Sequence, residues 1–269
     1  MISPPARGAW NMAVDEAILE AAGRGEVPPT LRLYAWEPPC LSLGYAQPFE
    51  DVDLDGLRSN GWEVVRRPTG GRAILHTDEL TYAICGPHDV PLLQGSVLES
   101  YHRISVALLN ALHLLGAPAE SAPAPQVAPG SDPKGPVCFE VPSSYEITAS
   151  GKKLIGSAQA RKQIGVLQHG SLPLYGDLTR ITRALSFPNE ASRQRAAERL
   201  MRRATTLEGV LGRRITWPEA AQAFMNAFGE VLSLKMGDLT AGERARAEEI
   251  LAEKYAHPAW TTRVLVTRS

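Results

Sequence analysis

Residues 64–87 constrain the fold of this chain more than any other stretch; they read VVRRPTGGRAILHTDELTYAICGP. An apolar run ends at two arginines, and a Pro-Thr-Gly-Gly turn follows. Two segments of strand character come next, at residues 72–76 and 79–85, and the second places its larger apolar side chains at every other position. The pattern predicts short β-strands separated by tight turns.

The glycine pair in this stretch is a candidate binding loop. Consecutive glycines between strands let the backbone adopt positive φ and approach a ligand without a Cβ in the way. The bare amides of Gly70 and Gly71, next to Arg66, Arg67 and Arg72, would suit a phosphate or a developing oxyanion. A hairpin turn with surface arginines fits the same residues, so this stretch alone leaves both interpretations open.

The order of the predicted elements indicates the fold class. A chain of 269 residues has room for one large domain or two small ones. Segments of strand character lie at residues 31–36, 41–45, 62–66, 72–76, 79–85, 145–147, 153–159 and 165–174. Helices are predicted at residues 11–22, 95–116, 177–185, 217–232 and 241–255, with Asn11 as one N-cap and capping boxes at Ser96/Glu99, Thr205/Glu208, Thr216/Glu219 and Thr240/Glu243. Meandering strands followed by helices predict an α+β domain.

Composition excludes several classes of protein. Hydrophobic residues make up 44% of the chain and charged residues 21%, with a net charge of −1, so nothing argues for a nucleic-acid or membrane partner. We find neither a basic N-terminal segment followed by an apolar one nor an apolar run long enough to span a membrane. The three cysteines are odd in number and share no metal-ligand spacing. We therefore expect a cytoplasmic protein without a metal site.

The segment at residues 117–137 is rich in proline, and it ends at Cys138. Its prolines argue against a helix or a central strand, and a loop this long inside a compact protein is more often functional than idle. Cys138 is therefore a candidate nucleophile, because a thiolate attacks thioesters well and a nearby ammonium, such as Lys152 or Lys153, lowers the pKa of the thiol. A domain linker and an inert loop cysteine remain the alternatives from these residues alone.

Small residues mark two further positions where a ligand or a second strand could approach closely. They are Gly156-Ser157-Ala158 and His169-Gly170-Ser171, each within a predicted strand.

Five segments, in order along nearly the whole chain, resemble the lipoate-protein ligase A superfamily, which shares a fold with the biotin ligases. They are GAWNMAVDEAIL at 8–19, RRPTGGRAILH at 66–76, GKKLIGSAQARK at 151–162, VLQHGSL at 166–172 and KYAHPAWT at 254–261. The resemblance implies the biotin/lipoate ligase catalytic-domain fold, with mixed and antiparallel sheets flanked by helices, as a single domain over residues 1–269. It also implies that Lys153 is the active-site lysine of the family.

Two departures from the family pattern separate its branches. Adenylating ligases carry a third glycine after the glycine pair and an aspartate directly after the histidine, whereas this chain has Arg72 and Thr77-Asp78 there. CFEVPSSYEI at 138–147 resembles the cysteine segment of the octanoyltransferases of many Gram-positive bacteria, in which this cysteine forms an acyl thioester and no ATP is used. The classical octanoyltransferases place their cysteine after the lysine strand, where this chain has none. Because the chain ends at Ser269, we also expect no accessory C-terminal domain.

The resemblance therefore implies an octanoyltransferase that moves octanoyl from acyl carrier protein to a lysine of a lipoyl-accepting protein, such as glycine cleavage H protein, in the first step of endogenous lipoate synthesis. Catalysis is assigned to Cys138 and Lys153. The predicted substrate-binding residues, all within the matched motifs, are Arg67, Gly70, Gly71, Arg72, Ala73, His76, Gly156, Ser157, Ala158, His169 and Gly170. We expect a monomer with no cofactor of its own, since the phosphopantetheine belongs to the substrate.

Three other interpretations remain open from the sequence. They are an ATP-dependent lipoate ligase whose accessory domain is a separate chain, an amidotransferase between lipoyl-domain proteins, and a non-catalytic carrier-binding or ligand-sensing relative. A basic stretch at residues 190–214, with seven arginines against three acidic residues, fits either a docking face for an acidic carrier or an ordinary solvated helix.

Overall fold

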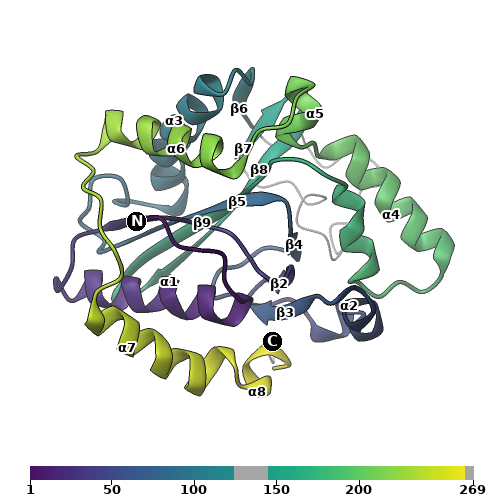
Figure 1. Cartoon of the computed structure of the whole chain (residues 1–269), viewed down its shortest axis with the longest axis horizontal. Helices are drawn as coiled ribbons and strands as arrows, with labels where there is room; N and C mark the ends of the chain where they lie inside the picture. The colour runs from purple at the N-terminus through teal and green to yellow at the C-terminus, as the bar shows by residue number, and fades with distance from the viewer. Residues whose placement is uncertain (124–144, 264–269) are drawn as a thin grey trace.

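The computed structural model describes residues 1–123 and 145–263 (Figure 1). Cys138 and the proline-rich segment from residue 124 onward lie outside the described residues.

Within this part of the chain, six strands form the larger sheet (Figure 1). Their order is β1 (Thr30–Tyr34), β5 (Glu79–Gly86), β9 (Gly165–Pro173), β8 (Lys152–Lys162), β7 (Tyr145–Ala149) and β6 (Ala119–Pro123). All neighbouring strands in this sheet are antiparallel. Among the described strands, the predicted proline-rich segment begins as the edge strand β6, and an edge position tolerates proline because one side of the backbone is not needed for pairing.

The smaller sheet has the order β3 (Glu63–Arg66), β2 (Cys40–Leu43) and β4 (Ile74–His76). β2 runs parallel to β3 and antiparallel to β4. An antiparallel sheet and a small mixed sheet, both flanked by helices, confirm the predicted α+β class.

Helices cover both faces of the larger sheet (Figure 1). α3 (Val97–Leu114) and α6 (Trp217–Val231) pack together on one face, and α1 (Gly8–Gly23) lies on the other, with α7 (Ala241–Ile250) against its outer side. The alternation of β5 divides accordingly. Leu80, Tyr82 and Ile84 pack into the α3–α6 core, whereas Ala83 and Cys85 pack against α1.

The remaining elements surround the smaller sheet and the C-terminal region. They are η1 (Phe49–Asp51), α2 (Leu54–Asn60), η3 (Leu178–Arg183), α4 (Glu190–Arg203), α5 (Leu207–Leu211), the π-helical turn η4 (Leu251–Tyr255) and α8 (Pro258–Thr261). A third apolar cluster fills the space between β2, β4, η3 and α4, and it includes Leu41, Ile74, Ile181 and Leu200.

The predicted helix starts are confirmed in part. Capping boxes are present at Ser96/Glu99, Thr216/Glu219 and Thr240/Glu243. The fourth prediction is wrong by one residue, because Thr206 caps α5 by accepting from the backbone amide of Gly209. The predicted helix at residues 177–185 is a 3₁₀-helix, η3, capped by Asp177.

Asn11 is not an N-cap. α1 begins three residues earlier, at Gly8, and Asn11 is buried within it. Its side-chain amide donates to the carbonyls of Ala6, at 3.1 Å, and Ala35, at 3.0 Å. The amide therefore fastens the N-terminal segment and the end of β1 to the helix, a long-range use that no local capping pattern reveals.

Candidate active site

A β-bulge decides which face of the sheet Lys153 occupies. β7 and β8 are joined by a turn at Ser150 and Gly151, whose φ values of 52° and 72° are both positive. Thr148 pairs with Lys153, but Ile147 pairs with Ile155, so Leu154 is an extra residue in β8. Because side chains alternate along a strand, the bulge turns Lys153 away from the α3–α6 core that holds Ile155.

Lys153 lies in a buried polar pair. Its Nζ donates to Oε1 of Glu146 at 2.8 Å, and the two residues are only 5% and 8% exposed. The hydroxyl of Thr148, on the strand position opposite Lys153, is buried without a hydrogen-bond partner among the described residues. Lys152 points elsewhere, donating to the carbonyl of Met201 at 2.8 Å near the end of α4. The two lysines therefore have different environments, as the alternation of a strand predicts.

Glu146 is a site residue that the sequence prediction missed. Its signal was weak: one carboxylate within a short predicted strand, seven residues before Lys153 and on the face opposite to buried Ile147. Only the pairing of β7 with β8 shows that this carboxylate meets the lysine.

A cavity lies where the two sheets and α1 meet. It is bordered by Met12, Trp36, Ser42, Arg67, Ile74, His76, Thr81, Gly156, Ser157, Ala158, His169, Gly170 and Ser171. Seven of the predicted substrate-binding residues are among these: Arg67, His76, Gly156, Ser157, Ala158, His169 and Gly170. The structure thus brings together, in one place, motifs that lie about 100 residues apart in the chain, as the 2.6 Å contact between Thr69 and His169 shows.

The other four predicted residues do not border this cavity. They belong to the loop between β3 and β4, and they are Gly70, Gly71, Arg72 and Ala73. Ala73 is fully buried in the cluster beneath the smaller sheet. Gly71 has a φ of 89° and lies so close to Gly44 that a Cβ on Gly44 would collide with its carbonyl oxygen. Gly70 borders open space, so its side of the loop is accessible to a ligand.

Neither arginine before this loop lies on the surface. Arg66 is 0% exposed and Arg67 is 3% exposed, so the alternative of surface arginines is wrong for both. Arg67 Nη2 donates to the carbonyls of Gly70, at 2.7 Å, and Arg72, at 2.8 Å. Arg66 donates to four backbone carbonyls of other segments, including Thr261 of α8 at 2.7 Å. The arginines therefore hold the glycine loop and the C-terminal region in place.

His76 lies in a buried network of hydrogen bonds. Its Nε2 meets Oγ of Ser42 at 2.8 Å, and its Nδ1 meets Oε1 of Glu79 at 2.7 Å. Thr81 and Ser171 also donate to the Glu79 carboxylate. Burial alone would raise the pKa of Glu79, but the charge of His76 and these hydrogen bonds outweigh it and hold that pKa below its usual value.

His169 is fastened from two sides. Its Nε2 meets the hydroxyl of Thr69 at 2.6 Å, and its Nδ1 lies 3.6 Å from Oδ2 of Asp15. Burial lowers the pKa of His169, despite the nearby Asp15. The negative charge of Asp15 is balanced by Arg32, whose Nη1 lies 2.7 Å from Oδ1 of Asp15. A neutral imidazole fixed by two partners suits a wall of the cavity better than a mobile acid or base.

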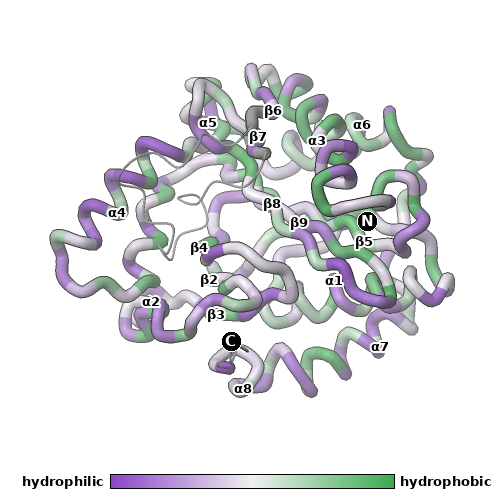
Figure 2. Tube along the Cα trace, turned by 180° about the vertical axis from the view of Figure 1, so that it is seen from behind, coloured by the Kyte–Doolittle hydropathy of each residue, from purple (hydrophilic) through white to green (hydrophobic). Residues whose placement is uncertain are grey.

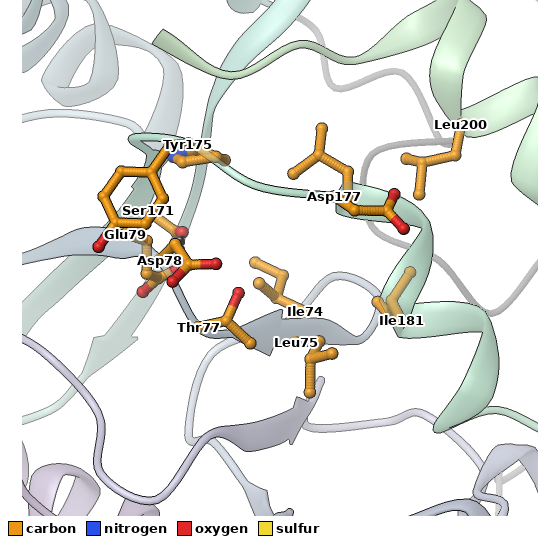
Figure 3. Close-up of a pocket in the computed structure, with 12 residues that line it drawn as sticks. Ile74, Leu75, Thr77, Asp78, Glu79, Ser171, Tyr175, Asp177, Ile181 and Leu200 are labelled. Carbon is orange, nitrogen blue, oxygen red and sulfur yellow. Dashed lines mark hydrogen bonds between the residues drawn. The ribbon is translucent and has the colours of Figure 1, made fainter. Parts of the chain in front are cut away.

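A second cavity adjoins the first, since Ile74 and Ser171 border both. Figure 3 shows it between the turn from β4 to β5, the end of β9, η3 and Leu200 of α4. Asp78, the aspartate displaced by one position from the ligase pattern, lies on its wall in an ion pair with Arg180. In this chain Asp78 therefore fastens the turn before β5 to η3.

The two other cysteines are unsuited to nucleophilic chemistry. Cys40 and Cys85 are both 0% exposed, and burial raises the pKa of each thiol well above its usual value. Cys138 is the third cysteine of the chain and stays the candidate nucleophile; it lies outside the described residues. No set of three or more His, Cys, Asp or Glu side chains in residues 1–123 and 145–263 is placed to hold a metal ion.

A model of a known protein family matches most of the chain. Residues 7–229 match the model of the lipoyl protein ligase A/B catalytic domain. The chain belongs to this family. It is also 42% identical over 261 residues to Octanoyltransferase LipM of Symbiobacterium thermophilum, covering 95% of this chain and 94% of that one. Octanoyltransferase LipM of Moorella thermoacetica is 44% identical over 256 residues, covering 94% and 93%. The chain therefore falls in the octanoyltransferase branch and is an acyltransferase of lipoate biosynthesis.

Solved structures confirm the fold. The bipartite lipoate protein ligase of Thermoplasma acidophilum matches with a TM-score of 0.77 and 25% identity, covering 100% of this chain and 96% of that one. A lipoate-protein ligase A bound with ATP matches with a TM-score of 0.76 and 25% identity, covering 98% and 97%. In the part of the chain that the structure describes, no helix has the length and apolar character to cross a membrane.

Proposed function

We propose that this acyltransferase takes octanoyl from octanoyl-acyl carrier protein and delivers it to a lysine of a lipoyl-accepting protein, through a thioester on Cys138. The observation that carries the proposal is the identity of 42–44% to octanoyltransferases over nearly the full length of both chains. Two observations support it: the buried Lys153–Glu146 pair, and the cavity bordered by most of the predicted binding residues, among them Gly156 on the same strand as Lys153.

In the first step, the Cys138 thiolate attacks the thioester carbonyl of the donor. A bond forms between the Cys138 sulfur and the acyl carbon, and the bond from that carbon to the pantetheine sulfur breaks. The carrier leaves as a thiol with the proton that Cys138 gave up. Because one thioester replaces another, the step needs no nucleotide.

In the second step, the acceptor lysine attacks the Cys138 thioester as a neutral amine. The carbon–nitrogen bond forms, the carbon–sulfur bond breaks, and a second proton from the nitrogen restores the Cys138 thiol. The net reaction converts the acceptor ammonium into an amide and releases one proton. An amide is more stable than a thioester, so transfer to the acceptor lysine is favourable.

Lys153 supplies a fixed positive charge to both steps. Its buried hydrogen bond to Glu146 holds the ammonium at one position, on the face of β8 that points away from the α3–α6 core. We assign it two roles: favouring the thiolate form of Cys138, and helping to place the acyl carbonyl. Glu146 is then a positioning residue, which acts through Lys153.

A transfer assay tests this function. Purified protein, octanoyl-acyl carrier protein and an apo lipoyl-accepting protein, mixed without ATP, should give an acceptor heavier by one octanoyl group. A ligase would instead need ATP and the free acid and would form AMP. Transfer that requires ATP would overturn the proposal in favour of ligation, and transfer only from an octanoylated lipoyl-domain protein would favour the amidotransferase.

A further inference from the structure

We propose that Thr148 is a further catalytic residue, whose hydroxyl donates a hydrogen bond to the oxyanion that forms on the acyl carbonyl beside Lys153. The proposal rests on the proposed function, because it places the acyl transfer next to Lys153. Thr148 is not among the site residues predicted from the sequence.

Thr148 lies on the same face of the larger sheet as the Lys153–Glu146 pair. In the register of β7 and β8, Thr148 pairs with Lys153, and the Cβ atoms of directly opposed residues lie about 5 Å apart. Glu146 is two residues before Thr148 and shares its face, whereas Ile147 and Ala149 pack into the α3–α6 core. Thr148 is 7% exposed and Lys153 is 5% exposed. A group that reaches the ammonium of Lys153 therefore also comes close to the hydroxyl of Thr148.

The hydroxyl of Thr148 differs from the hydroxyls that border the first cavity. Its oxygen is buried and has no hydrogen-bond partner within residues 1–123 and 145–263. The four hydroxyls of the cavity wall, in contrast, each bond to another side chain; they belong to Ser42, Thr81, Ser157 and Ser171. An unpaired buried hydroxyl destabilises a fold, and a valine would fill the same space without that cost. Such a group calls for an explanation, and a bound partner supplies one.

The charge of Lys153 indicates what kind of atom the hydroxyl would bind. The ammonium disfavours a cation at this position, and the negative charge of Glu146 is already balanced by it at 2.8 Å. An ammonium and a hydroxyl side by side are two hydrogen-bond donors, and they suit an oxygen that carries or develops negative charge. The acyl oxygen becomes such an atom during transfer.

The hydroxyl serves both steps of the transfer without giving up its proton. When the Cys138 sulfur bonds to the acyl carbon, an electron pair of the carbonyl moves to its oxygen, where Thr148 and Lys153 stabilise the oxyanion. When the bond from that carbon to the pantetheine sulfur breaks, the pair returns and the carbonyl forms again. The attack of the acceptor amine on the Cys138 thioester repeats this sequence. Because the oxygen is more negative in the transition state than in the bound thioester, Thr148 acts on kcat.

Replacing Thr148 by valine tests the proposal, because valine keeps the shape of the side chain and removes the hydroxyl. Thr148→Val should lower kcat for octanoyl transfer on the order of a hundredfold, with little change in KM for octanoyl-carrier. Its melting temperature should not fall, since no hydrogen bond of the hydroxyl within the described residues is lost. Thr148→Ser keeps a hydroxyl and should recover most of the loss. An unchanged kcat in Thr148→Val, or a loss that Thr148→Ser does not recover, would overturn the proposal.

The pH profile separates this role from that of Lys153. The charge of Lys153 sets the pKa of the Cys138 thiol, so the pKa read from kcat/KM should be the same in Thr148→Val as in the wild type. A shifted profile would mean that Thr148 acts on the thiolate and would contradict a role at the oxyanion.

Ser121 of β6 provides a matched control. It pairs with Ile147, so its side chain faces the α3–α6 core, and its hydroxyl likewise has no partner among the described residues. Ser121→Ala should leave kcat unchanged, and a loss equal to that of Thr148→Val would assign both effects to strand packing. If Thr148→Val does not fold, Thr148→Ala removes the same hydroxyl and should lower kcat to the same extent. A wild type that transfers no octanoyl would refute the proposed function, whereas transfer that the Thr148 variants leave unchanged would refute only the role of Thr148.

Discussion

Lys152 and Lys153 are neighbours in sequence but occupy different environments. Lys153 is buried against a carboxylate on the site face of the sheet, whereas Lys152 bonds to a carbonyl near the end of α4. Strand alternation places the two side chains on opposite faces, and a single extra residue, Leu154, in the pairing of β8 with β7 decides which of the two faces away from the α3–α6 core. At the residue scale, the chemistry of the site therefore depends on one backbone irregularity.

Replacing each lysine by alanine tests this difference. Lys153→Ala should raise the pKa of the Cys138 thiol, slow its alkylation at neutral pH, and lower octanoyl transfer on the order of a hundredfold, because a fixed charge beside the reacting atoms is lost. Lys152→Ala is the matched control and should change transfer less than about threefold, in line with other surface substitutions. Alkylation rates with iodoacetamide across pH provide the measurement. Equal losses in the two variants would remove the assignment of Lys153.

At the element scale, one buried carboxylate joins α1 to two distant segments. Glu16 of α1 accepts from Lys162 at the end of β8 at 2.6 Å, and from Lys254 and Tyr255 of η4. Although burial opposes its charge, the two ammonium groups lower the pKa of Glu16 to about 2. The KYAHPAW segment, matched by family resemblance, is thereby fastened to α1, which contributes Met12 to the border of the first cavity.

The lowered pKa of Glu16 predicts how the stability of the fold depends on pH. A carboxyl whose pKa is lower in the folded than in the unfolded state stabilises the fold above the unfolded value, 4.5, and loses that contribution as pH falls toward 2. The melting temperature of the wild type should therefore fall faster between pH 4.5 and 2.5 than that of Glu16→Gln. Calorimetry checks this, with exposed Glu253→Gln as the control. Parallel curves for wild type and Glu16→Gln would show that Glu16 contributes nothing in this range.

α4 is a candidate docking element for the carrier. Figure 2 shows it as largely hydrophilic, and Arg195 and Arg202 are exposed on it. Acyl carrier proteins, the donors that the family resemblance implies, are acidic around their prosthetic group. The exposed arginines of α4 should therefore act mainly on the rate at which the carrier associates with the enzyme. Arg199 and Arg203, by contrast, are half-buried and make contacts of their own. The exposed pair therefore gives the cleaner test.

Neutralising this exposed pair separates docking from a solvated surface. Arg195→Gln/Arg202→Gln should raise KM for octanoyl-carrier severalfold at low ionic strength, with the effect shrinking above about 0.1 M salt, where the Debye length falls below about 10 Å. Transfer from a small octanoyl thioester should not change. Arg244→Gln, an exposed arginine on α7, is the control. An unchanged KM for the carrier would mean that α4 is only a solvated surface.

At the scale of the whole molecule, local signals in the sequence predicted much of the fold. The capping box at Ser96/Glu99 and the alternation of β5 depend only on nearby residues, and the structure confirms both. Long-range pairings were not predictable in this way. The prediction of Asn11 as a cap is wrong because its partners include Ala35, and no local pattern predicts Glu146, because only strand pairing brings it to Lys153.

The site shows the same division. The motifs around His76, Gly156 and His169 converge on one cavity, and their role in binding substrate stays a prediction. Trp36, which borders that cavity, lies in no motif, and its position follows from its hydrogen bond to Thr81 of the larger sheet and its stacking on His76 of the smaller sheet. A residue that is positioned by tertiary packing leaves no local signature in the chain. The roles of Cys138 and of the glycine loop stay predictions.

The central claim, a thioester on Cys138, is tested most directly by the intact mass of the protein after mixing with octanoyl-acyl carrier protein. We predict a single added octanoyl group that hydroxylamine removes, that is absent from Cys138→Ala, and that persists when the buried Cys40 or Cys85 is replaced by serine in a variant that still folds. An unmodified wild type during active transfer, or full transfer activity in Cys138→Ala, would contradict the account.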